Sequence, residues 1–409
     1  MDTRPRRGPD TPRVGPAPEC PPVDPDVAAD PRAAYDAMRE RCPVAHDGRA
    51  QWTVFRHADI VRVVGDASTF SNIVSRHPSV PNGMDPPEHT AYRCVIETYF
   101  SAERVAAFEP ECRRLASALG GAVCRPPRGA PAASPVRVDV MRTLGLPFAA
   151  EAQCAYFGWP VALSIPLIEW AHRNHEATLA RDQSETAAVA TEFERLVDDL
   201  LHVRNGAGPA APRDLTESLL RERVGGRPID RAAIVSVLRN CTMGEVGTIA
   251  ASVGIIARFL AERPDEQERL RRDPAGLPSA IDEILRLHGP LVDNRRVATG
   301  PTTIGERRIE RDDRVVVNWV AANRDPRAFA DADQYRPDRD PADNLLYGAG
   351  IHVCPGAPLA RLELRVMTEV LLAATASMAL LSDRPARHAV YPAGGYASLW
   401  LEITATRAR

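Results

Sequence analysis

The stretch YGAGIHVCPGAPLAR, residues 347–361, places a cysteine in a short loop rich in glycine, with a histidine two residues before it. Apolar residues recur at helical spacing directly after the loop. Gly348 and Gly350 allow a tight turn and a close approach to a flat ligand. Gly356, two residues after Cys354, has no side chain and so leaves the other side of the cysteine unobstructed. The stretch therefore predicts a loop built around one cysteine side chain.

A cysteine sulfur that binds a metal does so as the thiolate, which needs surroundings that keep it ionised. The helix expected from Ala360 onward would aim its N-terminal amide groups at the Cys354 sulfur and favour negative charge there. A thiolate that ligates haem iron uses all of these features. Haem ligation is therefore the chemistry that the loop favours.

Composition sets wide limits on function. The chain has 409 residues, 44% of them hydrophobic and 26% charged, with a formal net charge of −3. This charge gives no reason to expect nucleic acid or an anionic membrane as a partner. No run of 18 or more apolar residues suggests a membrane span, and the proline-rich start lacks the apolar stretch of a signal peptide. We expect residues 1–20 to be a flexible segment. All 51 basic residues are arginine, so arginine abundance alone indicates little.

The eight cysteines form no CxxC pair and no regular spacing. Without a secretion signal, a disulfide framework is not expected, and most of the cysteines are interpreted as small core residues in a reducing cytosol. The absence of a second close cysteine also argues against structural zinc. Cys354 therefore needs an explanation of its own.

Most of the sequence has the 3.6-residue period of amphipathic helices, with strand-like stretches towards the ends. One helix is predicted to run from an Asp230 cap to Pro264, long enough to cross the whole core. A second begins after a Ser101 cap, and a short one ends at Gly289. Residues 295–326 alternate like paired strands. The pattern predicts a mainly α fold with a small sheet-rich lobe.

The loop resembles the haem-binding loop of the cytochrome P450 family, phenylalanine–glycine–x–glycine–x–histidine–x–cysteine–x–glycine. The one departure is Tyr347 in place of the phenylalanine. The resemblance extends over most of the chain and implies one P450 domain, residues 21–409, although length alone would suggest two or three domains. It implies haem b held between the long central helix and the loop, with Cys354 as the axial ligand. Tyr347, Gly348, Gly356 and, on the central helix, Gly244 would line the cofactor.

Further motifs of the family are present. EILR matches the E-x-x-R motif, so Glu283 and Arg286 would form a structural triad with Arg339 of YRPDR. The resemblance also implies a set of residues that contact the haem propionates, because two buried carboxylates need cationic donors. These residues are His89 and Arg93 of MDPPEHTAYR, Arg296 of RRVAT, and His352.

The central helix departs from the family pattern of glycine–x–acid–threonine, which relays protons during oxygen activation. Aligned on Gly244, Val246 takes the place of the acid and Gly247 that of the threonine. A carboxyl and a hydroxyl remain at Glu245 and Thr248, each displaced by one residue. Two glycines inside a helix cost about 1 kcal/mol each, so either a ligand approaches the helix closely or Gly247 packs against a neighbour. Thr248, Glu245 and Gly247 are the candidate catalytic positions.

The resemblance implies a monooxygenase that inserts one oxygen atom from O2 into a small organic substrate. Electrons would come from NAD(P)H through a separate ferredoxin and ferredoxin reductase, docking near Arg361 and Arg365 on the cysteine face. We expect a cytoplasmic monomer that contacts neither nucleic acid nor membrane. The alternatives are a peroxide-dependent or radical-coupling haem-thiolate enzyme, and a haem-binding protein without turnover.

The expected substrate pocket lies beside the central helix, where Arg239 and Met243 are one turn apart. Val292, Asp293 and residues 73–83 match other regions that line the substrate in the family. An arginine in such a pocket favours an anionic or strongly hydrogen-bonding substrate, because an unpaired buried charge is costly. A solvated or salt-bridged Arg239 is the alternative.

Overall fold

The computed structural model describes residues 31–48, 51–75, 78–126, 129, 131, 134–180, 183–206 and 214–406. The segment expected to be flexible, residues 1–20, lies outside them. The α-helices are α1 (Pro31–Arg41), α2 (His57–Gly65), α3 (Glu88–Glu97), α4 (Ala102–Val123), α5 (Leu146–Phe157), α6 (Ser164–Ala180), α7 (Gln183–Gly206), α8 (Leu215–Leu219), α9 (Arg231–Ala261), α10 (Pro264–Arg272), α11 (Leu277–His288), α12 (Trp319–Asn323) and α13 (Ala357–Ala374).

The strands are short and form several small sheets. They are β1 (Val44–His46), β2 (Gln51–Val54), β3 (Phe70–Ser71), β4 (Val136–Asp139), β5 (Arg223–Val224), β6 (Arg227–Pro228), β7 (Asp293–Ala298), β8 (Thr302–Ile304), β9 (Arg307–Ile309), β10 (Arg314–Asn318), β11 (Thr375–Leu380), β12 (Arg387–His388), β13 (Tyr396–Ser398) and β14 (Trp400–Ala405). The expectation that strands lie only towards the ends of the chain is wrong for β4, β5 and β6.

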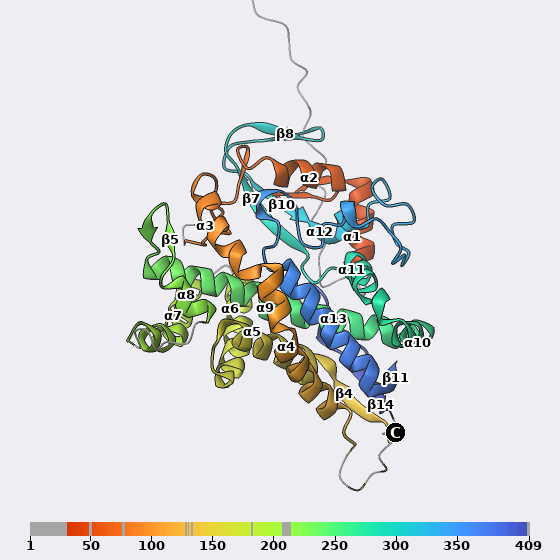
Figure 1. Cartoon of the computed structure of the whole chain (residues 1–409). Coiled ribbons are helices and arrows are strands. Elements are labelled where there is room, and N and C mark those ends of the chain that lie inside the picture. Colours follow the sequence, from red (N-terminus) through yellow and green to blue (C-terminus); the bar gives the residue numbers. More distant parts are fainter. Residues whose placement is uncertain are drawn as a thin grey trace, which may run out of the picture.

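The largest sheet has the order β1-β2-β10-β7-β3, and only its β2–β10 pair is parallel. The predicted pairing within residues 295–326 is confirmed, since β7 pairs with β10 and β8 with β9, the latter across a turn at Gly305. In Figure 1 this sheet forms the upper lobe with α1, α2 and α12, while most of the other helices lie below it. A second sheet, β11-β14-β4, lies at the opposite end.

Helix α9 runs through the middle of the helical part, and 20 of its residues are buried. Its predicted cap is confirmed, because the Asp230 carboxylate accepts a hydrogen bond of 2.8 Å from the Ala233 amide. Helices α5, α6, α11 and α13 pack against α9, and α13 lies beside α4. The fold is the mainly α architecture that the sequence pattern predicts.

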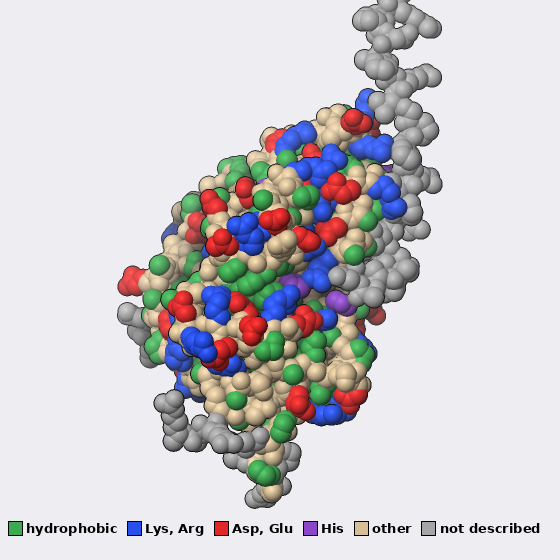
Figure 2. Space-filling view, turned by 90° about the vertical axis from the view of Figure 1, so that its right-hand side faces the viewer, with side chains coloured by type: hydrophobic (Ala, Val, Ile, Leu, Met, Phe, Trp, Pro, Cys, Tyr) green, Lys and Arg blue, Asp and Glu red, His purple; other side chains and the backbone are tan. Residues whose placement is uncertain are grey.

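Among the described residues, α9 alone is long and apolar enough to cross a membrane by length and composition. However, 67% of its most apolar window is buried inside the protein, so its composition is that of a core helix. On the side of the molecule shown in Figure 2, basic and acidic side chains are intermingled. No broad area of one charge is seen on that face.

Candidate active site

Cys354 lies between a short 3-10 turn, Gly350–His352, and the start of α13. Its amide donates a hydrogen bond of 2.8 Å to the Tyr347 carbonyl, which closes the loop. Gly348 and Gly350 have positive φ angles of 74° and 70°, and a Cβ on Gly350 would collide with the carbonyl oxygen of Val64. The two glycines are therefore required by backbone conformation and by contact with the end of α2.

The Cys354 sulfur lies at the N-terminus of α13. This helix begins at Ala357, three residues earlier than expected, so its first turn reaches the loop directly. Residue Cys354 keeps accessible surface, yet the protein around its sulfur is dense enough for burial to raise the thiol pKa. Hydrogen bonds from the Gly356 and Ala357 amides act in the opposite direction and lower this pKa. These amides would stabilise a thiolate that ligates a metal ion.

The face of α9 around Gly244 and Gly247 is open. A Cβ on either glycine would meet no atom within 4 Å, whereas Val246 between them is fully buried in the core. The alternative that Gly247 packs against a neighbour is therefore wrong. Thr248 borders the same face, and its hydroxyl donates a 2.5 Å hydrogen bond to the Gly244 carbonyl.

Glu245 does not share that open face. Its Oε1 is buried without a hydrogen-bond partner among the described residues, as are both carboxyl oxygens of Glu363 on α13, and the two carboxyls act on each other electrostatically. Burial raises the pKa of both carboxyls, and that of Glu363 is raised further by the charge of Glu245. Thus the structure separates the three candidate catalytic positions, with Gly247 and Thr248 on the open face and Glu245 turned towards the cysteine helix.

The four residues predicted to contact propionates come together from three parts of the chain. The rings of His89 and His352 lie 4.1 Å apart, and Arg296 and Arg93 act electrostatically on His352. Burial first, and then the charges of His89, Arg296 and Arg93, lower the His352 pKa to about 3. Arg93 contacts Glu97 at 2.6 Å and also donates to the Val353 carbonyl.

This cluster has more hydrogen-bond donors than acceptors. Both ring nitrogens of His89 and Nε2 of His352 are buried without a partner among the described residues. Arg296 is 5% exposed, and its guanidinium donates to the Arg295 carbonyl at 2.8 Å. Buried donors without acceptors are costly. The residues therefore fit a group that brings carboxylates, as haem does.

Glu283 and Arg286, the residues of the E-x-x-R motif, are buried and form a hydrogen-bonded network with Arg339. Arg286 donates to both carboxylate oxygens of Glu283, at 2.7 and 2.9 Å, and Arg339 donates to the same carboxylate at 3.0 Å. Arg286 also donates to the Ala332 carbonyl at 2.9 Å. The network ties α11 to the segment that precedes the cysteine loop.

Tyr347 of the loop, and Arg361 and Arg365 of α13, all have defined surroundings in the structure. The Tyr347 hydroxyl is buried without a partner among the described residues, and the Arg361 guanidinium lies 4.4 Å from the centre of its ring. Arg361 pairs with Asp282 at 3.0 Å. Arg365 pairs with Glu109 at 2.7 Å and with Glu369 at 2.9 Å. Neither arginine is a free positive charge.

The predicted substrate residues lie on different elements. Arg239 donates 2.9 Å to the Pro78 carbonyl and forms no salt bridge within the described part of the chain. Burial lowers its pKa, whereas the charge of Glu194 raises it. Met243 receives a 3.2 Å contact from the Asn174 amide of α6. Arg239 is thus in contact with residues 73–83, the other segment expected to line the pocket.

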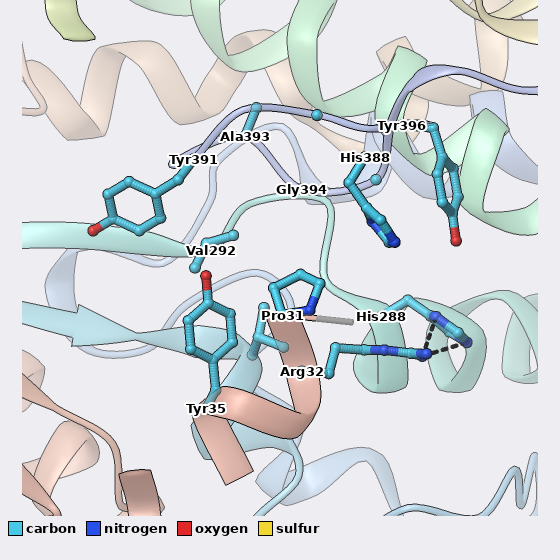
Figure 3. A pocket seen from close by; sticks show the side chains of 13 residues that line it. Pro31, Arg32, Tyr35, His288, Val292, His388, Tyr391, Ala393, Gly394 and Tyr396 are labelled. Carbon is cyan, nitrogen blue, oxygen red and sulfur yellow. Dashed lines mark hydrogen bonds between the residues drawn. The ribbon is translucent and has the colours of Figure 1, made fainter. Parts of the chain in front are cut away.

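Val292 lines a small cavity between α1, the end of α11 and the segment before β13 (Figure 3). Arg32 and His288 hydrogen-bond to each other at 2.6 Å on one side of it. At about 70 Å³ the cavity is too small for an organic substrate of drug size. Asp293 is buried beside it, and burial raises its pKa to about 7, partly offset by the charge of Arg295.

Comparisons with known proteins agree with this geometry. Residues 277–374 match the sequence model of the family described as cytochrome P450. Erythromycin C-12 hydroxylase of Saccharopolyspora erythraea is 30% identical over 351 residues, which cover 82% of this chain and 85% of that protein. The chain is a cytochrome P450. Linalool 8-monooxygenase of Pseudomonas putida is 28% identical over 371 residues, covering 83% of this P450 and 88% of that protein.

Solved P450 structures superpose over nearly the whole chain. A mutant of P450 EryK in complex with erythromycin B has a TM-score of 0.79 at 27% identity, covering 92% of this chain and 97% of that one. CYP109Q5 from Chondromyces apiculatus has a TM-score of 0.81 at 25% identity, and the match covers 94% of this chain and 98% of that one. This P450 is therefore a haem-thiolate monooxygenase with the P450 fold.

One residue of the site was missed by sequence reasoning. Glu363 lies between Leu362 and Leu364, within the buried face of α13, and is 0% exposed. A carboxyl among apolar residues that repeat at helical spacing is the signal that could have identified it.

Proposed function

We propose that this P450 hydroxylates or otherwise oxygenates a small organic substrate that carries an anionic or strongly hydrogen-bonding group. Electrons come from NAD(P)H through a separate ferredoxin and ferredoxin reductase in the cytoplasm. The observation that carries the proposal is the Cys354 loop, whose sulfur accepts hydrogen bonds from the Gly356 and Ala357 amides. Relatives that oxidise erythromycin and linalool support a role in the chemistry of small natural products.

The residues described above have separate roles in this proposal. When bound, haem supplies the redox chemistry that activates O2. Cys354 would hold the iron, and His89, Arg93, Arg296 and His352 would hold the propionates. On the other side, Gly244 and Gly247 leave room beside α9, and Thr248 presents a hydroxyl oxygen there that can accept and pass on a proton.

Arg239 supports an anionic substrate. Its guanidinium donates to a backbone carbonyl, and the residue is partly buried at the junction of α9 with residues 78–80. A guanidinium offers five donors, so several remain for a carboxylate or a similar acceptor. A substrate anion would offset the desolvation that lowers the Arg239 pKa.

Arg361 and Arg365 alone would attract a ferredoxin to the cysteine face only weakly, because both are paired with carboxylates. Arg365, Arg113, Glu109 and Glu369 form a network with two charges of each sign, which weakens electrostatic steering by its arginines. We therefore expect the rate of electron transfer to depend only modestly on salt concentration.

Carbon monoxide binding to the reduced protein tests the ligation. We expect the red-displaced Soret band that thiolate ligation produces, and its loss in Cys354→Ser. Cys94→Ser is a matched control, because Cys94 is a free, exposed cysteine of α3. A wild-type protein without the displaced band would contradict the proposal.

Reconstitution tests the electron route and the peroxide-dependent alternative. The purified P450 is combined with a bacterial ferredoxin, its reductase and NAD(P)H, and substrate oxidation is compared with a reaction given only hydrogen peroxide. We expect product with the redox proteins. If product formed only when peroxide was added, the result would favour the peroxide-dependent alternative, which is kept open by Val246 in the place of the family's acid and Gly247 in the place of its threonine.

A further inference from the structure

Side chains of α9 bind the backbone of residues 78–82, which lie between β3 and α3. The Val80 amide donates to the Ser236 hydroxyl at 2.9 Å, and the Asn240 side-chain amide donates to the Val80 carbonyl at 2.9 Å. Ser236 and Asn240 are four residues apart, so they lie on the same face of the helix, one turn apart. Both polar backbone groups of Val80 are therefore bound by this one face of α9.

The start of the same segment is bound to α9 as well. The Ser236 hydroxyl donates to the Pro78 carbonyl at 3.1 Å, and the Arg239 guanidinium donates to the same carbonyl at 2.9 Å. The Ser79 hydroxyl donates to the side-chain carbonyl of Asn240 at 3.1 Å. The Pro78 carbonyl is thus shared by a hydroxyl and a guanidinium, and its position helps to set the orientation of the guanidinium.

The segment is also packed into the core and closed on itself. Val80 is 2% exposed and belongs to the main hydrophobic core. The Gly83 amide donates to the Ser79 carbonyl at 2.6 Å, and the Asn72 side-chain amide donates to the Asn82 carbonyl at 2.9 Å. Such a segment opens only when several hydrogen bonds break together, and buried polar groups that lose their partners are costly. It is therefore poorly suited to act as a mobile gate.

We propose that Ser236 and Asn240 are positioning residues that keep residues 78–82 fixed on α9 as a rigid wall of the substrate pocket, and that this wall orients Arg239. Neither side chain needs to contact the substrate, because each acts through the backbone of the segment. An anionic group then meets a guanidinium that is already held in place, so binding does not have to order the wall. Ligands enter the pocket without separating this segment from α9. The inference rests on the proposed function for the position of the pocket and the role of Arg239.

Hydrogen exchange of the full-length, haem-loaded protein tests the fixed segment without any substrate. A peptide that covers residues 78–84 reports its amides, and we expect slow exchange that is the same with and without the haem ligand 4-phenylimidazole. Ser236→Ala and Asn240→Leu should each raise the exchange rate about 10-fold, because each leaves a backbone group of Val80 without its partner. Ser79→Ala leaves both bonds of Val80 in place, so its effect should be smaller.

Spectral titration with a pair of probes tests the orientation of Arg239. One probe is 4-phenylimidazole, whose nitrogen binds haem iron, and the other is the same ligand with a carboxylate on the phenyl ring. Arg239 lies five residues before Gly244, about 7.5 Å along the helix axis, which is comparable to the length of the second probe. We expect the wild type to prefer the carboxylate probe. Ser236→Ala and Asn240→Leu should each reduce this preference about 10-fold, with a smaller change in affinity for the neutral probe.

Ser252→Ala is the matched control, because Ser252 is a buried serine of α9 whose hydroxyl donates to a carbonyl of its own helix. Its exchange and its probe affinities should equal those of the wild type. Free exchange of the wild-type segment, or wild-type exchange in Ser236→Ala and Asn240→Leu, would overturn the fixed wall. Faster exchange with an unchanged probe preference would overturn the orienting role. A wild type that binds both probes equally would contradict the anionic substrate and, with it, the orientation of Arg239, leaving the exchange rates to decide the wall.

Discussion

Nε of Arg339 lies 3.0 Å from Oε1 of Glu283, although 56 residues separate them in the chain. The same carboxylate binds Arg286 one helical turn further along α11, at 2.7 Å. Buried charges are retained only when each is paired and hydrogen-bonded. The contact therefore fixes the segment before the cysteine loop to α11, and through it the position of Cys354.

We expect Glu283→Ala to fail to retain haem. Removing one partner of a buried ion pair costs about 3–5 kcal/mol, and here two guanidinium groups would lose their carboxylate. The measurement is the haem content of the purified variant, from its absorbance relative to protein. Glu310→Ala, which removes the exposed partner of Arg308, should keep normal haem content. A Glu283→Ala protein with full haem would contradict a structural role of the triad.

The sequence was sufficient for the parts of the site that depend on local motifs. The turn around Cys354 and the long helix after Asp230 follow from spacing and composition within short segments, and the structure has both. The E-x-x-R pair was assigned through resemblance to a family, and Glu283 and Arg286 are in contact. Arg339 and the His89–His352 contact were assigned through resemblance to a family, since no local pattern reveals a contact between distant segments.

The rest depended on three-dimensional packing. Periodicity does not show which way a side chain on a largely buried helix is turned, so the sequence placed Glu245 one residue away from the family's acid position but could not show that it interacts with Glu363. Arg361 and Arg365 were expected to lie where a redox partner docks, and the sequence did not show that both arginines form ion pairs. Their partners Asp282 and Glu109 come from other helices, so no sequence spacing relates them.

Gly247→Ala tests whether the open face of α9 faces bound ligand. An alanine in place of a helical glycine stabilises a protein by up to about 1 kcal/mol. A Cβ on Gly121 of α4 would likewise meet no atom within 4 Å, so Gly121→Ala should show this gain in urea unfolding. We expect no such gain for Gly247→Ala in the haem-loaded protein, and a changed spin-state spectrum. An equal gain with an unchanged spectrum would show that nothing approaches Gly247.

Arg239→Leu tests the anchoring of an anionic substrate. Small carboxylates that shift the haem spectrum should bind about 10- to 150-fold more weakly to the variant, since a charge-assisted hydrogen bond contributes about 1.5–3 kcal/mol. Arg231→Leu, at the exposed start of α9, is the matched control. Unchanged spectral titrations in Arg239→Leu would mean that the guanidinium serves only to hold the Pro78 carbonyl.

Asp293 should make the stability of the folded protein depend on pH. Burial raises its pKa from an ordinary value of 3.8 to about 7, and Oδ2 has no hydrogen-bond partner among the described residues. The unfolded chain therefore releases this proton at lower pH than the folded protein does. Folding stability is unaffected by Asp293 below about pH 4 and falls as pH rises towards about 7. With 1.36 kcal/mol per pKa unit, the loss amounts to about 4 kcal/mol.

The variant Asp293→Asn cannot ionise and should lack this loss. Urea unfolding of the two proteins should therefore diverge as pH rises, with the variant the more stable above about pH 7. Tyr35 is the neighbouring titratable group, and burial together with the charge of Asp293 raises its pKa to about 12, so it stays neutral across the range. Parallel stability curves for wild type and Asp293→Asn would show that Asp293 is ionised in the folded protein at neutral pH, stabilised there by the charge of Arg295.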